Sequence, residues 1–251
     1  MDAATLQRHL ETHLRVATFP LGIRSLAPGE PVPPRAKRPR RDLGGKVAIC
    51  QALSAARRLG WTLAFDGEDL ACPIAKAVFG FEARNAYYTS GALADGMYAA
   101  CREAGARFEE ALAKYAPGEI AAVAAGPLAR VDFEPDTVLV YGNSAQVLRL
   151  LNACLWEKGG ALRSEFSGRG DCADIVIKGR KTGEPQVILP CYGDRIFGQA
   201  ADDEMAFTFP FARREEVVRG LEGTHRGGVR YPIPVYQRFE PQFPASYQEL
   251  E

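Results

Sequence analysis

Residues 137–146, Thr137-Val-Leu-Val-Tyr-Gly-Asn-Ser-Ala-Gln146, decide the fold class of this chain. The run Thr137–Tyr141 is largely apolar and short, which is typical of a buried strand. Asn143 or Ser144 can then cap a helix over 145–158, because a side-chain oxygen at that position accepts a hydrogen bond from a free backbone N–H of the first turn. We therefore predict a strand that leads directly into a helix.

The segments on both sides of this unit extend the same alternation. Further helices are expected at 2–16, 46–59, 73–78, 94–115 and 212–221, from apolar residues at helical spacing or from a proline at the first helical position. Further strands are expected at 61–65, 120–125, 161–166, 173–178, 186–189 and 205–209. The stretch Thr18–Leu26 resembles a strand but is interrupted by Pro20 and Gly22. The sequence thus predicts an α/β or α+β fold with a mixed sheet and helices packed on it.

One domain is expected over residues 1–228, followed by a tail at 229–251 that is rich in proline and aromatic residues. The 251 residues are 47% hydrophobic, which is enough to bury a substantial core. Gln51–Cys72 and Gln146–Cys172 both run through helix, glycine, strand, glycine turn and cysteine, which suggests a weak internal duplication. The aromatic tail suggests contact with a second subunit, and therefore a homodimer.

Composition excludes several classes of function. Lys and Arg total 31 and Asp and Glu total 31, so no overall charge favours nucleic acid or an anionic membrane. No apolar run approaches the roughly 18 residues of a membrane-spanning helix, and the first residues lack a secretory signal pattern. We expect a cytoplasmic protein. Only three histidines are present, which argues against a histidine-rich metal site.

The six cysteines are the most informative residues. Cys101 and Cys154 are predicted on apolar faces of helices, where a free cysteine behaves as a small hydrophobic residue. The remaining four lie near a helix start or at turns, where loops of such folds gather, and they are Cys50, Cys72, Cys172 and Cys191. Residues placed in this way could converge on one metal site.

Four thiolates suit tetrahedral zinc or an iron–sulfur cluster. Structural zinc typically uses paired Cys-x-x-Cys ligands, and this chain has none, since 21, 99 and 18 residues separate the four cysteines. From spacing alone, a cluster, a zinc ion and a metal-free set of thiols all remain open.

Cations near the cysteines in sequence are candidates for holding an anion or for tuning a negatively charged cluster. The basic run Arg35–Arg41 supplies Arg38 and Arg40, and Arg195 follows Cys191. Asn143 begins a predicted helix whose N-terminus suits an anion. Hydrophilic loops and ordinary helix capping explain the same residues equally well.

Several motifs in fixed order resemble the family catalogued as domain of unknown function 169. They include Ile49-Cys-Gln-Ala-Leu-Ser-Ala-Ala-Arg57, Asp69-Leu-Ala-Cys-Pro73, Val138–Gln146, Cys172-Ala-Asp174, Cys191-Tyr-Gly-Asp194 and Ala201-Asp-Asp-Glu204. The resemblance covers roughly residues 10–222. It implies a cysteine-bearing prokaryotic soluble protein of unassigned function, with thiols at the positions of Cys50, Cys72, Cys172 and Cys191.

With this resemblance we expect the four cysteines to bind one 4Fe–4S cluster. Four ligands favour electron transfer or redox sensing, and three would leave one iron free to act on a small anionic substrate. One alternative is a non-catalytic module, with structural zinc or no metal, that binds a small anion through Arg38, Arg40 and Asn143. Another is a thiol redox protein in which Cys172 and Cys191 pair. Expected partners are a small anion or a redox protein, with no nucleic acid and no membrane, and no catalytic residue is assigned.

Overall fold

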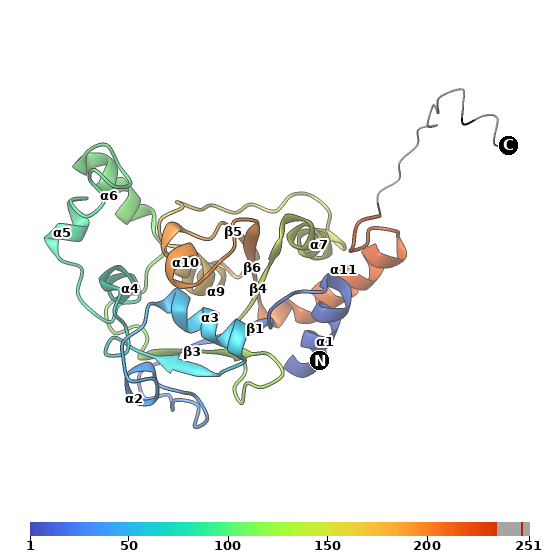
Figure 1. The fold of residues 1–251 in the computed structure, drawn as a ribbon, viewed down its shortest axis with the longest axis horizontal. Helices are drawn as coiled ribbons and strands as arrows, with labels where there is room; N and C mark the ends of the chain where they lie inside the picture. The colour runs from blue at the N-terminus through green and yellow to red at the C-terminus, as the bar shows by residue number, and fades with distance from the viewer. Residues whose placement is uncertain (235–246, 248–251) are drawn as a thin grey trace.

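The computed structural model describes residues 1–234 and residue 247, and one sheet lies at its centre with helices on both sides (Figure 1). The strands are β1 (Leu21–Leu26), β2 (Leu63–Phe65), β3 (Ala122–Pro127), β4 (Thr137–Asn143), β5 (Gln186–Ile188) and β6 (Glu204–Pro210). The longer helices are α1 (Ala3–Leu14), α3 (Ile49–Leu59), α6 (Arg102–Ala111), α7 (Ser144–Leu155) and α11 (Arg214–Arg226). The short helices are α2 (Pro39–Asp42), α4 (Pro73–Val78), α5 (Ala86–Thr89), α8 (Asp171–Ala173), α9 (Gly179–Thr182) and α10 (Tyr192–Phe197), with a π-helix η1 (Asp174–Lys178) and a 3-10 helix η2 (Phe211–Arg213).

The sheet has the strand order β2-β3-β1-β4-β6-β5. The expected combination of a sheet with packed helices is confirmed. Every pair of neighbouring strands is antiparallel, so among the described residues parallel pairing is limited to isolated bridges such as Lys37 with Leu63. β1 lies near the middle of the sheet because it pairs with both β3 and β4. Pro20 precedes its first residue, so the missing backbone N–H does not interrupt the ladder.

Both faces of the sheet are covered, and most consecutive strand residues are therefore buried. Ile23, Leu139 and Tyr141 point to the face covered by α3, α4 and η1. Val138 and Phe207 point to the opposite face, where α1, α7 and α11 pack. Figure 1 shows α1, α7 and α11 together at one end of the molecule and α5 and α6 at the other.

Several local predictions are correct. Asn143 caps α7, with its side chain accepting from the Gln146 N–H at 3.0 Å, and the Gln146 side chain accepts from the Asn143 N–H. Pro73 is the first residue of α4, which ends at Val78 as predicted. Gly60 ends α3 with φ +73°, which a glycine adopts without a Cβ clash.

The strand predicted at 173–178 is wrong, because the chain is helical from α8 through η1 to α9. This segment packs against β5, β6 and α4, so Ile175, Val176 and Ile177 are all buried without joining the sheet. Their β-branched side chains favoured a strand, and tertiary contacts overrode that preference.

Two further predictions are also corrected. No strand forms at 161–166, so the predicted duplication lacks its second strand. The helix predicted at 94–115 is shorter, since α6 covers only Arg102–Ala111 and Met97 is exposed.

None of the helices in the described part of the chain is both long and apolar enough to cross a bilayer. The predicted tail at 229–251 lies mostly outside the described residues, apart from 229–234 and 247. Within it, the Tyr231 hydroxyl accepts a hydrogen bond from Asn143 Nδ2 at 3.1 Å.

Candidate metal centre

All four predicted ligand cysteines lie where helices begin on the face of the sheet that α3 covers. Cys72 and Cys191 are the N-caps of α4 and α10. Cys50 and Cys172 are in the first turns of α3 and α8. Each is partly exposed and none forms a disulfide. Helix starts leave backbone N–H groups free, and these donors favour a thiolate over a thiol.

The four thiols share one neighbourhood around Cys172. Burial raises the pKa of the Cys172 thiol well above its usual value, and the nearby charges of Asp171, Cys191, Cys72 and Cys50 raise it further. Such mutual effects require short separations, because interactions between charges weaken with distance and screening.

Gly193 brings two of these sulfurs close to one short stretch of chain. The Cys50 Sγ lies 3.7 Å from the Gly193 carbonyl oxygen, to which it donates. A Cβ built on Gly193 would lie 3.7 Å from the Cys191 Sγ. Cys50 and Cys191, which are 141 positions apart in sequence, therefore meet at the start of α10.

The spacing of the sulfurs distinguishes between kinds of metal site. Four thiolates on one zinc ion stand about 3.8 Å apart, given tetrahedral geometry and Zn–S bonds of about 2.3 Å. Within the described residues, no three of these sulfurs lie within 4.8 Å of one another. Cluster ligands bind different iron atoms and stand farther apart. As placed in this structure, the four sulfurs are therefore too far apart to share one zinc ion.

Two buried carboxyl groups adjoin the thiols. Asp171 accepts from the Cys191 Sγ at 3.0 Å and from the Cys191 N–H at 3.1 Å. Asp194 accepts from the Tyr141 hydroxyl at 2.6 Å. Burial raises the pKa of Asp194 to about 7, with the charge of Asp171 adding to the effect. Burial and Asp171 together raise the pKa of Cys191 to about 12. In the metal-free state the Cys191 thiol is therefore protonated, and a metal must displace that proton.

A buried cation balances this cluster of acidic groups. The Arg57 guanidinium lies 4.0 Å from the centre of the Tyr141 ring and binds both carboxylate oxygens of Glu204, at 2.8 and 3.0 Å. The side chain of Arg57 is 1% exposed. Glu204, Arg57, Tyr141 and Asp194 thus form a continuous polar chain from the sheet to the cysteines.

The segment carrying α5 and α6 adds aromatic residues on the exposed side. Burial raises the pKa of Tyr98 and so does the charge of Cys191, while the Arg169 guanidinium lies 4.9 Å from the Tyr98 ring. Arg169 in turn forms a buried ion pair with Glu109 of α6. This ion pair holds α6 against the chain just before Cys172.

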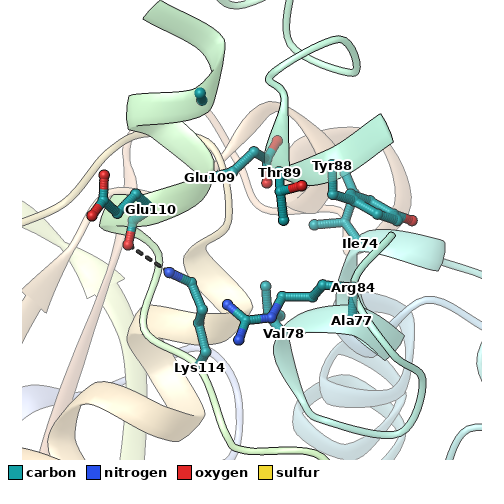
Figure 2. Close-up of a pocket in the computed structure, with 10 residues that line it drawn as sticks. Ile74, Ala77, Val78, Arg84, Tyr88, Thr89, Glu109, Glu110 and Lys114 are labelled. Atoms are coloured by element: carbon teal, nitrogen blue, oxygen red, sulfur yellow. Dashed lines mark hydrogen bonds between the residues drawn. The ribbon is translucent and has the colours of Figure 1, made fainter. Parts of the chain in front are cut away.

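A pocket of about 270 Å³ opens beside α4, close to Cys72 (Figure 2). Its walls combine apolar side chains with two cations, Arg84 and Lys114, which Figure 2 shows on the same side of the pocket. Burial lowers the pKa of Lys114 and the neighbouring charge of Arg84 lowers it further. Tyr88, another lining residue, has a pKa raised by burial and by Cys72. Glu109 and Glu110 also line the pocket, so its suitability for a small anion is limited to the side that carries Arg84 and Lys114.

The residues that were predicted to bind an anion or to tune a cluster make contacts with other parts of the protein. Arg38 bonds to Asp66 and Asp69, and Arg40 lies 3.1 Å from Glu68. Glu68 and Asp69 share a pocket with both arginines, and Asn143 does not line it.

Arg195 and Asn143 are likewise engaged. Arg195 donates to the Ala201 carbonyl oxygen at 2.6 Å, and Asn143 uses its side chain to cap α7 and to contact Tyr231. The structure does not bring the three residues of the predicted anion site, Arg38, Arg40 and Asn143, into one pocket, and a role for each in anion binding stays a prediction.

The two cysteines predicted to be structural differ from each other. Cys154 is buried in α7, as predicted, and burial raises its pKa to about 12. Cys101 is exposed and is the N-cap of α6, so its predicted place on an apolar helix face is wrong. The helix begins at Arg102, eight residues later than the start predicted at residue 94.

Sequence reasoning missed the polar groups that surround the thiols. Asp171 directly precedes Cys172, and Asp194 ends the motif Cys191-Tyr-Gly-Asp194, so their closeness to cysteine was a usable signal. Arg57 carried no such signal, because it reads as an ordinary charge in the last turn of α3.

Comparisons with known proteins give a family and little more. A family model described as an uncharacterised ArCR, domain of unknown function 169, matches residues 9–220. A stretch of 105 residues is 33% identical to an uncharacterized protein of Methanocaldococcus jannaschii, and the match covers 41% of this chain and 45% of that protein. The chain thus matches less than half of that relative's length. No solved structure gives a significant match.

Proposed function

Because the chain belongs to the uncharacterised ArCR family, domain of unknown function 169, whose description assigns no activity, we propose its function from the cysteines: Cys50, Cys72, Cys172 and Cys191 bind one 4Fe–4S cluster. The family membership expected from the sequence motifs is confirmed. The proposal is supported by the placement of the four cysteines at helix starts on one face of the sheet, with Cys50 and Cys191 brought together at Gly193.

The surroundings support a negatively charged cofactor in specific ways. All four cysteines lie at helix starts, where backbone N–H groups are free, and hydrogen bonds to sulfur are one of the means by which proteins tune cluster potential. Asp194 has a pKa of about 7 and Asp171 shares its surroundings, so the pair need not carry two negative charges beside a cluster. When bound, the cluster supplies one-electron transfer. The residues of this chain hold it, shield it and limit its contact with water.

Electron transfer or redox sensing is the role that ligation by all four cysteines supports. Tyr192, Ile196 and Phe197 of α10 expose apolar side chains next to Cys191. Such an exposed apolar set beside a redox centre suits brief contact with a redox partner protein. We therefore propose a redox protein as the partner, as expected from the sequence.

The test is metal analysis of the full chain purified without oxygen, or reconstituted with iron and sulfide. We expect a brown protein with about four irons and four sulfides per chain, and a change in its visible spectrum on reduction with dithionite. A colourless protein with one zinc bound through cysteine would support the structural module instead. A metal-free protein with a reversible Cys172–Cys191 disulfide would support the thiol redox alternative.

A second candidate function is the binding of a small anion, and the pocket beside α4 specifically favours it. Arg84 and Lys114 line this pocket, and the Lys114 ammonium donates to the Glu110 carbonyl oxygen at 2.6 Å rather than to a carboxylate. Two cations near Cys72 would orient a carboxylate close to the cluster if only three cysteines ligate it.

We predict that Arg84→Ala weakens the binding of malate or citrate at least tenfold, because the loss of a charged hydrogen-bond partner costs about 1.5–3 kcal/mol. Isothermal titration of the full chain measures this. Arg40→Ala is the matched control, since Arg40 belongs to the anion site predicted from sequence. Equal binding by wild type and Arg84→Ala, with loss in Arg40→Ala, would place the anion at the basic run instead.

A further inference from the structure

All three histidines of the chain meet where α1 packs on α11. His9 and His13 are one turn apart on α1, and Glu222 and His225 are three positions apart on α11. Residues at these spacings share one face of a helix. The two faces point at each other, because α1 and α11 pack together.

The donor atoms are close enough to share one ion. One ligand atom each from His9, His13 and Glu222 lies within 4.8 Å of the other two. The His9 Nδ1 is 3.4 Å from a Glu222 carboxylate oxygen. The rings of His13 and His225 meet edge to face, and their centres lie 5.3 Å apart.

One of these donors has no partner of its own. The Nδ1 atom of His13 is buried and makes no hydrogen bond within the described structure. A buried nitrogen without a partner is costly, and in native proteins such an atom usually has a ligand, ion or water.

We propose that His9, His13 and Glu222, with His225 as the fourth donor, bind one zinc ion that joins α1 to α11. Imidazole nitrogen and carboxylate oxygen are ordinary zinc ligands, and four protein ligands make a closed, structural site. His9 and Glu222 are partly exposed, which leaves the ion a path from solvent. The ion would fix the N-terminal helix to the last helix of the domain. The small number of histidines argued against a histidine-rich metal site, and in this proposal Glu222 supplies the additional ligand.

This site is independent of the cysteines, and the experiment keeps the two apart. The full chain, stripped of metal with a chelator, is titrated with zinc chloride, and stoichiometry and thermal unfolding are followed. We expect one zinc per chain and a higher unfolding temperature, because a ligand that binds only the folded state stabilises it. The same result is expected in the Cys72→Ser and Cys172→Ser variants.

Glu222→Gln should weaken zinc binding about 100-fold or more, since loss of even an outer partner of a metal ligand costs about 10–100-fold. His13→Ala should weaken zinc binding to a similar extent. Glu103→Gln, the same exchange at an exposed residue of α6, is the matched control and should bind as wild type does. Cobalt(II) adds a spectroscopic readout, because thiolate ligands give an intense near-ultraviolet charge-transfer band that nitrogen and oxygen ligands do not.

Binding that survives in Glu222→Gln and His13→Ala but disappears in the cysteine variants, with a thiolate band for cobalt, would overturn the proposal. So would the absence of zinc binding by the folded wild-type chain. Neither result bears on whether the cysteines assemble a cluster in the presence of iron and sulfide.

Discussion

Cys72→Ser is expected to reduce iron from about four per chain to less than one, with loss of the brown colour. A serine hydroxyl is a poor replacement for a thiolate on iron, and clusters are held by cysteine thiolates. Serine is also a favoured N-cap residue, so the exchange preserves the start of α4 at Pro73. The loss would therefore report on ligation rather than on folding. Iron and sulfide analysis after anaerobic reconstitution measures it.

The chain offers a closely matched control for this variant. Cys101 is likewise the N-cap of a helix, α6, and is exposed. Cys101→Ser should keep about four irons, as should Cys154→Ala, while Cys50→Ser, Cys172→Ser and Cys191→Ser should lose them. Equal iron in Cys72→Ser and Cys101→Ser would show that Cys72 is not a ligand, and equal loss in all six would show that the choice of cysteines is wrong.

Arg57→Met is expected to lower the free energy of unfolding by about 3–5 kcal/mol, because removal of one partner leaves a carboxylate uncompensated in a desolvated site. Arg57 is almost fully buried and binds Glu204 through two hydrogen bonds. It also lies against the Tyr141 ring, so methionine replaces the stem but not the charge or the stacking. Urea denaturation of the metal-free chain, followed by circular dichroism, measures the difference.

The neighbouring residue provides the control. Arg58 is much more exposed, 3.6 Å from Glu204, and donates to the Gln199 carbonyl oxygen. Arg58→Met should cost less than about 1 kcal/mol, as exposed ion pairs do. Adding Glu204→Gln to Arg57→Met should recover part of the loss, since the unpaired charge is then removed. Equal costs for the two arginines would contradict a special role for the buried pair.

The local chemistry of helix starts and strands was predictable from the sequence. Pro73 began α4 and Asn143 capped α7, because a fixed φ angle and a side-chain acceptor act over only a few residues. Strand β4 followed from its apolar run. The position of β1 in the middle of the sheet did not, because pairing with β3 and β4 depends on residues about 100 positions away.

The same division holds for the candidate centre. The sequence by itself determined which four cysteines to consider, since their places beside turns and helix starts and their family pattern are local properties. Only the tertiary structure decided what surrounds them: Asp171 beside Cys191, Tyr141 on Asp194, and Arg57 between Tyr141 and Glu204. These contacts join strands and helices that are distant in the chain, and burial then sets their pKa values and charge balance. Three histidines scattered at both ends of the domain likewise formed one group only when α1 packed on α11, because helix packing brings together faces that sequence separates.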